Sequence, residues 1–273
     1  MKKLLLFIAI IVFTIKAEAQ GDLLVTPSRV VFEGNKQKEI LNLVNMGSET
    51  TTYSVSFVQK SMKEDGSFVD IIEAESGQQF ADPYLRIFPR QVTLAPNEAQ
   101  TIVVQYRRKA DMQSGEYRSH LFFRSEKDYT ALGDKTAAKD AKSLSVQLIP
   151  IFGMSIPVII RTGQTDVSAM LSDLKLDVQD KEVHNFSFTI NRTGNISLYG
   201  DIKVEFSPEK GKRFDIAAIN GVGVYTSIDK RSIRVQLDAA TMKLLKKGTL
   251  KVTYNSNGDG KSVVYATSDL VIE

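Results

Sequence analysis

Short apolar segments separated by turn residues recur along the chain, and this pattern most limits the folds it can adopt. In residues 53–57 apolar side chains alternate with serines, the two-residue period of a strand with one buried face. No stretch sustains the 3.6-residue period of an amphipathic helix, so the pattern predicts an all-β antiparallel sandwich. The predicted strands of the first half are residues 30–32, 40–44, 53–57, 68–72, 85–88, 92–94, 102–106 and 121–123.

A second set of apolar segments follows a short polar sequence at residues 161–165. We expect a domain boundary there, with residues 20–162 in the first domain and 163–273 in an all-β second domain. One helical turn is expected at residues 238–247, with Asp238 as N-cap and Gly248 as the C-terminal stop. The predicted strands of the second domain are residues 174–178, 186–190, 202–206, 222–225, 233–237, 250–254, 263–266 and 270–272.

The N-terminus has the pattern of a secretory signal peptide. Two lysines precede an apolar run over residues 4–12, and Ala17-Glu18-Ala19 gives the small-residue cleavage site. The run is too short for a comfortable membrane span, so we expect cleavage between Ala19 and Gln20 and export of the mature chain. An uncleaved anchor is the alternative.

The charge balance of the mature chain argues against a nucleic-acid partner. Residues 1–19 hold three of the 35 basic and one of the 32 acidic residues, so the net charge without them is about +1. A nucleic-acid binder normally shows a basic stripe with interleaved aromatic residues, which this sequence lacks. The chain has no cysteine, so core burial has to hold the fold without disulfides.

Residues 144–160 form the apolar stretch least like an ordinary core strand. About 17 residues exceed the usual strand length, and the polar segment 125–143 before them is longer than most loops. Either a bulge or bend near Pro150 and Gly153 divides the stretch, or part of it is held out for another chain. Two consecutive core strands are the plain alternative. In its first half the apolar residues that alternate with polar ones are Leu144, Val146 and Leu148.

Motifs for catalysis or cofactor binding are not found in the sequence. His120 and His184 lie in different predicted domains without cysteines or clustered carboxylates, so we expect structural roles for both and no metal site. Residues 258–262 resemble a phosphate loop, but a predicted strand follows them where that motif requires a helix, which favours a hairpin tip. With no nucleophile motif either, we expect neither an enzyme nor a cofactor.

Seven fragments of the first domain, by their order and spacing over about 135 residues, carry a family resemblance. They resemble the periplasmic pilus-assembly chaperones, the PapD-like family. The resemblance implies two immunoglobulin-like β-sandwich domains in tandem and a periplasmic location. The second domain is similar to the family only in length and strand content. The fragments are residues 27–34, 41–45, 83–89, 92–96, 100–104, 115–123 and 155–161.

The resemblance also implies how a partner is bound. In this family the last strand of the first domain donates alternating apolar side chains to an incomplete pilus subunit, by β-strand addition. A variable loop precedes that strand. Leu144, Val146 and Leu148 occupy that place here, directly after the long polar segment. They are therefore the predicted partner-binding residues of the strand.

Two further site residues follow from the resemblance. Arg29 matches one of two basic residues that hold the subunit's C-terminal carboxylate, for which a planar guanidinium is suited. The second family residue is a lysine, and Pro157 stands in its place. Arg161 matches the basic member of an interdomain ion pair. The usual acidic position holds Ser119, so Glu116 or a carboxylate of the second domain would have to substitute.

The expected function is that of a periplasmic chaperone that binds and caps fimbrial or pilus subunits by donating a β-strand, without ATP. Subunits of a surface fibre are the expected partners, with an outer-membrane usher as a further candidate and self-association through the exposed strand left open. The alternative is a secreted, envelope-associated immunoglobulin-like binding module, adhesin or scaffold protein. In that alternative, residues 144–160 are ordinary core.

Overall fold

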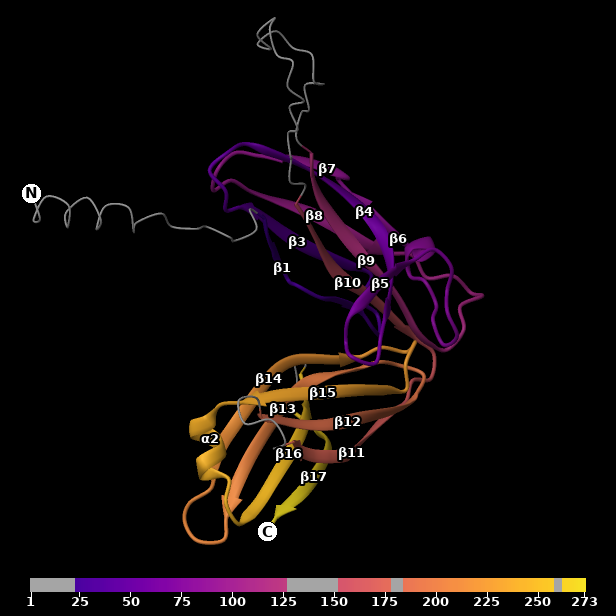
Figure 1. Cartoon of the computed structure of the whole chain (residues 1–273). Helices are drawn as coiled ribbons and strands as arrows, with labels where there is room; N and C mark the ends of the chain where they lie inside the picture. Colours follow the sequence, from indigo (N-terminus) through magenta and orange to yellow (C-terminus); the bar gives the residue numbers. More distant parts are fainter. Residues whose placement is uncertain (1–22, 127–151, 178–183, 258–261) are drawn as a thin grey trace, which may run out of the picture.

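The computed structural model describes residues 23–126, 152–177, 184–257 and 262–273 (Figure 1). The predicted cleavage site at Ala19 and Gln20 and the donor residues Leu144, Val146 and Leu148 lie outside these ranges. Within them, no helix has the length and apolar character needed to cross a membrane.

Strands β1 to β10 form the N-terminal sandwich. The first sheet has the order β1-β3-β8-β6, and the second has β2-β10-β9-β4-β5 with β7 also paired to β4. The strands are β1 (Leu23–Thr26), β2 (Val30–Phe32), β3 (Lys38–Asn45), β4 (Thr51–Met62), β5 (Phe68–Ile71), β6 (Leu85–Phe88), β7 (Gln91–Leu94), β8 (Ala99–Tyr106), β9 (Gly115–Glu126) and β10 (Gly153–Thr162), with a 3-10 turn η1 (Asp82–Tyr84) before β6.

The core of this sandwich follows from the alternation of side chains along the strands. In β3, Leu41 and Leu43 are buried while Asn42 between them is exposed. Burying each such side chain contributes roughly 1.5 to 3 kcal/mol, so the strands need no disulfide to hold the two sheets together. Other buried members are Phe32, Leu94, Ile102, Leu121, Phe123, Val158 and Ile160.

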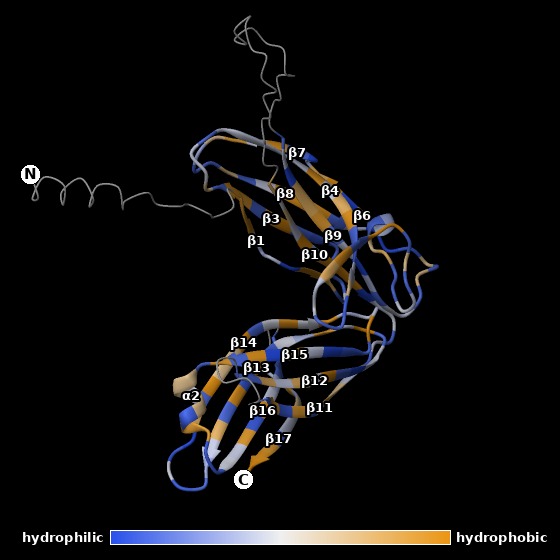
Figure 2. Ribbon diagram, in the orientation of Figure 1, coloured by the Kyte–Doolittle hydropathy of each residue, from blue (hydrophilic) through white to orange (hydrophobic). Residues whose placement is uncertain are grey.

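Strands β11 to β17 form the C-terminal sandwich, with sheets ordered β11-β12-β15 and β14-β13-β16-β17. Figure 2 shows apolar and polar residues alternating along many of these strands. Phe186, Phe188, Phe206, Val252 and Tyr254 belong to a core separate from the first. The strands are β11 (Val167–Asp177), β12 (His184–Gly194), β13 (Leu198–Pro208), β14 (Phe214–Val224), β15 (Lys230–Leu237), β16 (Gly248–Ser256) and β17 (Val264–Ile272).

The all-β class with two immunoglobulin-like sandwiches is confirmed, and the predicted strands need adjustment at two places. The four-residue strand β1 was not predicted, and the segments predicted at 263–266 and 270–272 are one strand, β17. Both adjustments come from pairing: β1 pairs with β3, and β17 runs along β16 for almost its full length. The boundary after Thr162 stays a prediction.

The helix α2 (Ala239–Leu244) begins where predicted and ends early. The Asp238 side chain accepts a hydrogen bond from the Thr241 amide at 2.6 Å, as an N-cap does. The last turn closes when the Leu245 amide donates to the carbonyls of Thr241 and Met242. Gly248 is not a helix stop, because it already pairs with Ile272 as the first residue of β16.

Candidate functional site

Glu116 joins the two sandwiches through a fully buried carboxylate. It lies on β9 and accepts hydrogen bonds from the Ser197 amide at 3.0 Å and the Ser197 hydroxyl at 2.7 Å, next to β13 of the other sandwich. Arg118 Nη2 lies 2.6 Å from one of its oxygens and Arg161 Nε lies 3.3 Å from the other. Burial alone would raise the pKa of Glu116, but the two arginines and Ser197 lower it to about 2. Glu116 is therefore an anion at neutral pH.

The guanidinium of Arg161 lies at the junction between the two sandwiches and contacts acceptors there. Besides Glu116, it donates from Nη2 to the Ser197 carbonyl at 3.3 Å, and its Nη1 lies 3.8 Å from Glu33. Ser119, at the position of the family's usual acidic residue, instead accepts hydrogen bonds from the Ala81 and Asp82 amides within the N-terminal sandwich. Because each nitrogen of the Arg161 guanidinium already has an oxygen nearby, Arg161 has no free N–H donor edge for a further anion.

Arg29 lies at the junction close to Arg118 and Arg161, and two of its buried donors are unsatisfied. Its guanidinium lies over the Tyr199 ring of β13, 4.3 Å from the centroid. Its Nε and Nη2 are buried and have no hydrogen-bond partner among the described residues. Burial, followed by the positive charges of Arg118 and Arg161, lowers the pKa of Arg29 to about 10, so it is still charged at neutral pH.

The charge at the junction does not balance. Three arginines surround the one buried carboxylate, that of Glu116. The other carboxylate nearby, that of Glu33, is more than half exposed. A buried charge without a partner is costly, so the cluster is suited to an added anion. A carboxylate fits because the Nε and Nη2 edge of a guanidinium presents two parallel donors. Pro157 can contribute no such donor.

The outer edge of β10 is open for half its length. On one side β9 pairs with every residue of β10. On the other, the short strand β2 pairs in parallel with Val158, Ile159 and Ile160 only. Among the described residues, the edge from Gly153 to Pro157 therefore has no strand partner. An unpaired strand edge is a template for another chain.

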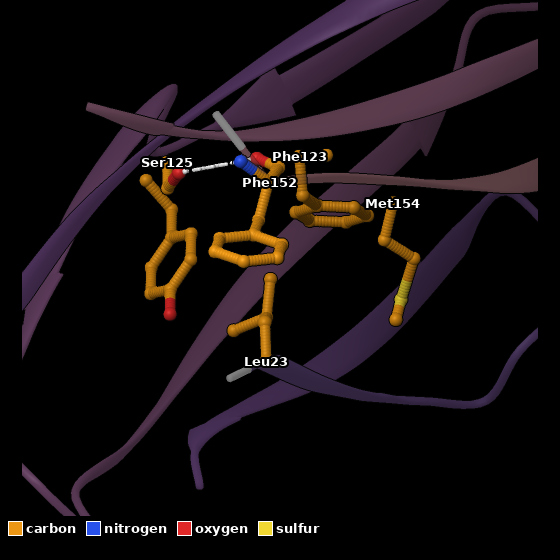
Figure 3. A pocket seen from close by; sticks show the side chains of 7 residues that line it. Leu23, Phe123, Ser125, Phe152 and Met154 are labelled. Atoms are coloured by element: carbon orange, nitrogen blue, oxygen red, sulfur yellow. Dashed lines mark hydrogen bonds between the residues drawn. The ribbon is translucent and has the colours of Figure 1, made fainter. Parts of the chain in front are cut away.

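An apolar cavity of about 100 Å³ lies at the start of β10. Figure 3 shows the Phe152 side chain among Leu23, Phe123 and Met154. Phe152 is 49% exposed. Ser125 fixes this residue, since its hydroxyl is within hydrogen-bond distance of both the Phe152 amide and carbonyl. The chain thus enters β10 beside a small open apolar surface between the two sheets.

Comparison with known proteins gives matches among solved structures alone. Neither a protein-family model nor a curated protein matches the chain. A chain from a chaperone–tip adhesin complex of CFA/I fimbriae biogenesis is 11% identical with a TM-score of 0.46, covering 92% of this chain and 99% of its own. The YadV chaperone (11%, TM-score 0.45) and the Pseudomonas aeruginosa CupB2 chaperone (11%, TM-score 0.44) each cover 92% of this chain and 100% of their own.

Several of the matching structures are fimbrial chaperones. The resemblance noted in the sequence is to the same class of protein. Within the part of the chain that the structure describes, no group of three or more His, Asp or Glu residues is placed to hold a metal ion.

Sequence reasoning missed most of the residues that surround Arg29 and Glu116. Arg118, Ser197, Tyr199 and Tyr225 had no predicted role, because contacts between domains depend on how the two sandwiches meet. One signal was present: Glu116, Arg118 and His120 occupy alternate positions of β9. Three successive polar residues on one face of a strand mark a face that meets something other than an apolar core.

His120 makes a second contact between the sandwiches. Its Nε2 lies 3.2 Å from the Tyr225 hydroxyl, its ring stacks on Tyr225, and Phe68 meets it edge-on. Burial, followed by Arg118 and Lys60, lowers the pKa of His120 to about 3, although Asp70 opposes this. His120 is therefore neutral in the folded protein at physiological pH.

This contact predicts a loss of stability in mild acid. Below the ordinary histidine pKa of 6.5 the unfolded chain binds a proton that the folded chain does not, until the pH reaches about 3. The free energy of unfolding should fall by roughly 2 kcal/mol between pH 6.5 and pH 5 from this residue. Urea titrations should show a shallower pH dependence for His120→Gln. His184→Gln, which keeps His120, should retain the wild-type slope; an equal slope in His120→Gln would contradict the assignment.

Proposed function

We propose that this chain is a periplasmic chaperone that captures subunits of a surface fibre by adding a strand to them, without ATP. The observation that carries the proposal is the open edge of β10, which is continuous in sequence with the alternating segment at residues 144–148. An adhesin or scaffold that keeps this segment as core would have no need for an unpaired edge beside it.

In this mechanism the partner is held by backbone pairing and by alternating pockets. Main-chain hydrogen bonds along the strand supply affinity, while Leu144, Val146 and Leu148 fill a groove that the subunit cannot fill itself. Covering that groove removes a surface that would otherwise aggregate. Transfer to an outer-membrane usher would release the subunit, and the same open edge would allow two copies of the chaperone to pair.

The position of Arg29 supports an orientation for the subunit. Val30 pairs with Val158 in parallel, so Arg29 lies about level with Pro157, at the interdomain end of the open edge. Leu148 precedes Pro157 by nine residues, which would span roughly 30 Å if the segment were fully extended. A subunit whose C-terminal carboxylate bound Arg29 would therefore run along the edge in the same direction as β10.

Substitution of Val146 by Asp tests the proposal. We expect the purified chain to keep its melting temperature within a few degrees and to lose subunit capture, because only the complex buries this side chain. The measurement is the amount of fibre subunit that co-elutes with the tagged chain from its native periplasm. Ser145→Asp adds the same charge on the opposite face of the strand and should preserve capture.

Two results would contradict the proposal. A large fall in melting temperature for Val146→Asp alone would place Val146 in the protein's own core, as the scaffold alternative requires. Equal capture by wild type and Val146→Asp would show that the segment does not hold the subunit.

A further inference from the structure

Two basic loops meet at the end of the C-terminal sandwich that lies away from the junction with the N-terminal sandwich (Figure 1). One connects β13 to β14 at residues 209–213, and the other connects the end of α2 to β16 at residues 245–247. A backbone hydrogen bond of 3.0 Å from the Glu209 amide to the Lys247 carbonyl holds them together. Between them lies an open hollow of about 510 Å³.

Lysines dominate this surface. Lys210, Lys243, Lys246 and Lys247 line the hollow and are exposed, and Lys212 lies in the same loop. None of these five lysines forms an ion pair with any residue that the structure describes; the pairs nearby join Lys203 to Glu205 and Asp215, and Arg213 to Glu205.

Few carboxylates are available to neutralise these lysines. Glu209 is the acidic residue in the hollow. Glu273 follows Ile272, which pairs with Gly248, so it lies close to Lys247. Glu205 and Asp215 already have cationic partners. The lysines outnumber the free acidic groups, so the surface carries an uncompensated positive charge that favours an anionic partner.

An exposed apolar side chain lies among the lysines. Leu244 is 58% exposed on α2, and Phe214 lines the base of the same hollow. Lysine heads are flexible point charges without the fork that fixes one carboxylate or phosphate group. Flexible cations around an exposed leucine match an extended anionic surface with an apolar layer beneath it.

We infer that this face, defined by Lys210, Lys212, Lys243, Leu244, Lys246 and Lys247, docks on an anionic phospholipid bilayer. The lysines attract the headgroups and Leu244 enters the interface. Because the face lies at the far end of the C-terminal sandwich, docking leaves Arg29 and the open edge of β10 free. The inference does not depend on the proposed function.

Vesicle binding tests this inference. The full mature chain is sedimented with phosphatidylcholine vesicles that contain or lack phosphatidylglycerol. We expect binding to the anionic vesicles, and salt should weaken it. Changing Lys243, Lys246 and Lys247 together to Ala should lower the partition coefficient by about a hundredfold, since each lysine near an anionic surface contributes about fivefold. Changing all three to Arg should retain binding.

A matched control distinguishes the effect of this particular face from the effect of the net charge of the chain. Lys38, Lys109 and Lys230 are exposed lysines on other parts of the chain, and changing them together to Ala removes the same charge. This control should bind almost as wild type does, while Leu244→Ser should bind several-fold more weakly. Equal binding to both kinds of vesicle, or equal losses in the two triple variants, would overturn the inference. Binding to polyglutamate without binding to anionic vesicles would also overturn it and would indicate an acidic protein partner.

Discussion

Replacing Glu116 with Gln should destabilise the folded chain by about 3 to 5 kcal/mol. Glutamine has the same shape and can still meet Ser197, but it leaves the mostly buried side chains of Arg118 and Arg161 without their anion, beside Arg29. For a chain of this size the melting temperature should fall by roughly 10 °C. Calorimetry of the purified variant is the measurement.

Acid titration gives a second test of the Glu116 contacts. The folded pKa of about 2 lies below the ordinary value of 4.5, so the stability that Glu116 contributes is complete above pH 4.5 and is lost as the pH falls toward 2. The stability of Glu116→Gln should not show this loss between pH 4.5 and 2. Glu39→Gln removes a carboxylate from a partly exposed surface pair with Lys36 and should cost less than about 1 kcal/mol. A similar small cost for Glu116→Gln would show that its contacts do not hold the junction.

Replacing Arg29 with Ala should weaken subunit binding by about ten- to a hundredfold. A hydrogen bond to a charged group contributes roughly 1.5 to 3 kcal/mol, and each 1.4 kcal/mol changes affinity tenfold. Arg29→Lys should recover only part of the loss, because an ammonium keeps the charge without the paired donors. The measurement is a titration of each variant with the subunit that co-elutes from the periplasm.

The stability of Arg29→Ala distinguishes a binding residue from a structural one. Two buried donors of Arg29 lack partners and two arginines lie nearby, so its removal should leave the melting temperature unchanged or higher. Arg90, exposed on the N-terminal sandwich, provides a control whose change to Ala should affect neither property. Titration against a subunit with an amidated C-terminus should abolish the difference between wild type and Arg29→Ala. An equal loss on both subunits would mean that Arg29 does not hold the carboxylate.

The fold was largely predictable because burial alternates along its strands. Leu41 and Leu43, or Phe186 and Phe188, show in sequence the same period of two that they show in the two cores. The end of α2 was less predictable, since the pairing of Gly248 with Ile272 competes with the helix. Pairing between distant segments cannot be read from a local pattern.

The junction between the sandwiches was predictable in part. Arg29 and Arg161 could be identified through the family resemblance, which left Glu116 or a carboxylate of the second domain as the acidic partner. Their partners Ser197 and Tyr199 come from the other sandwich, so the sequence around them shows nothing of the contact. The unsatisfied donors of Arg29 likewise depend on what surrounds it in three dimensions.

Photo-crosslinking at position 146 tests the central claim most directly. The tagged chain, with a photoreactive phenylalanine derivative in place of Val146, is irradiated in its native host cells, and the adducts are identified by mass spectrometry. The account predicts adducts with an exported fibre subunit, within that subunit's open apolar groove, and their loss when Arg29→Ala is added. The same derivative at Ser145 should give far less of this adduct. Crosslinks confined to the chain's own core, or equal adducts from positions 145 and 146, would contradict strand donation.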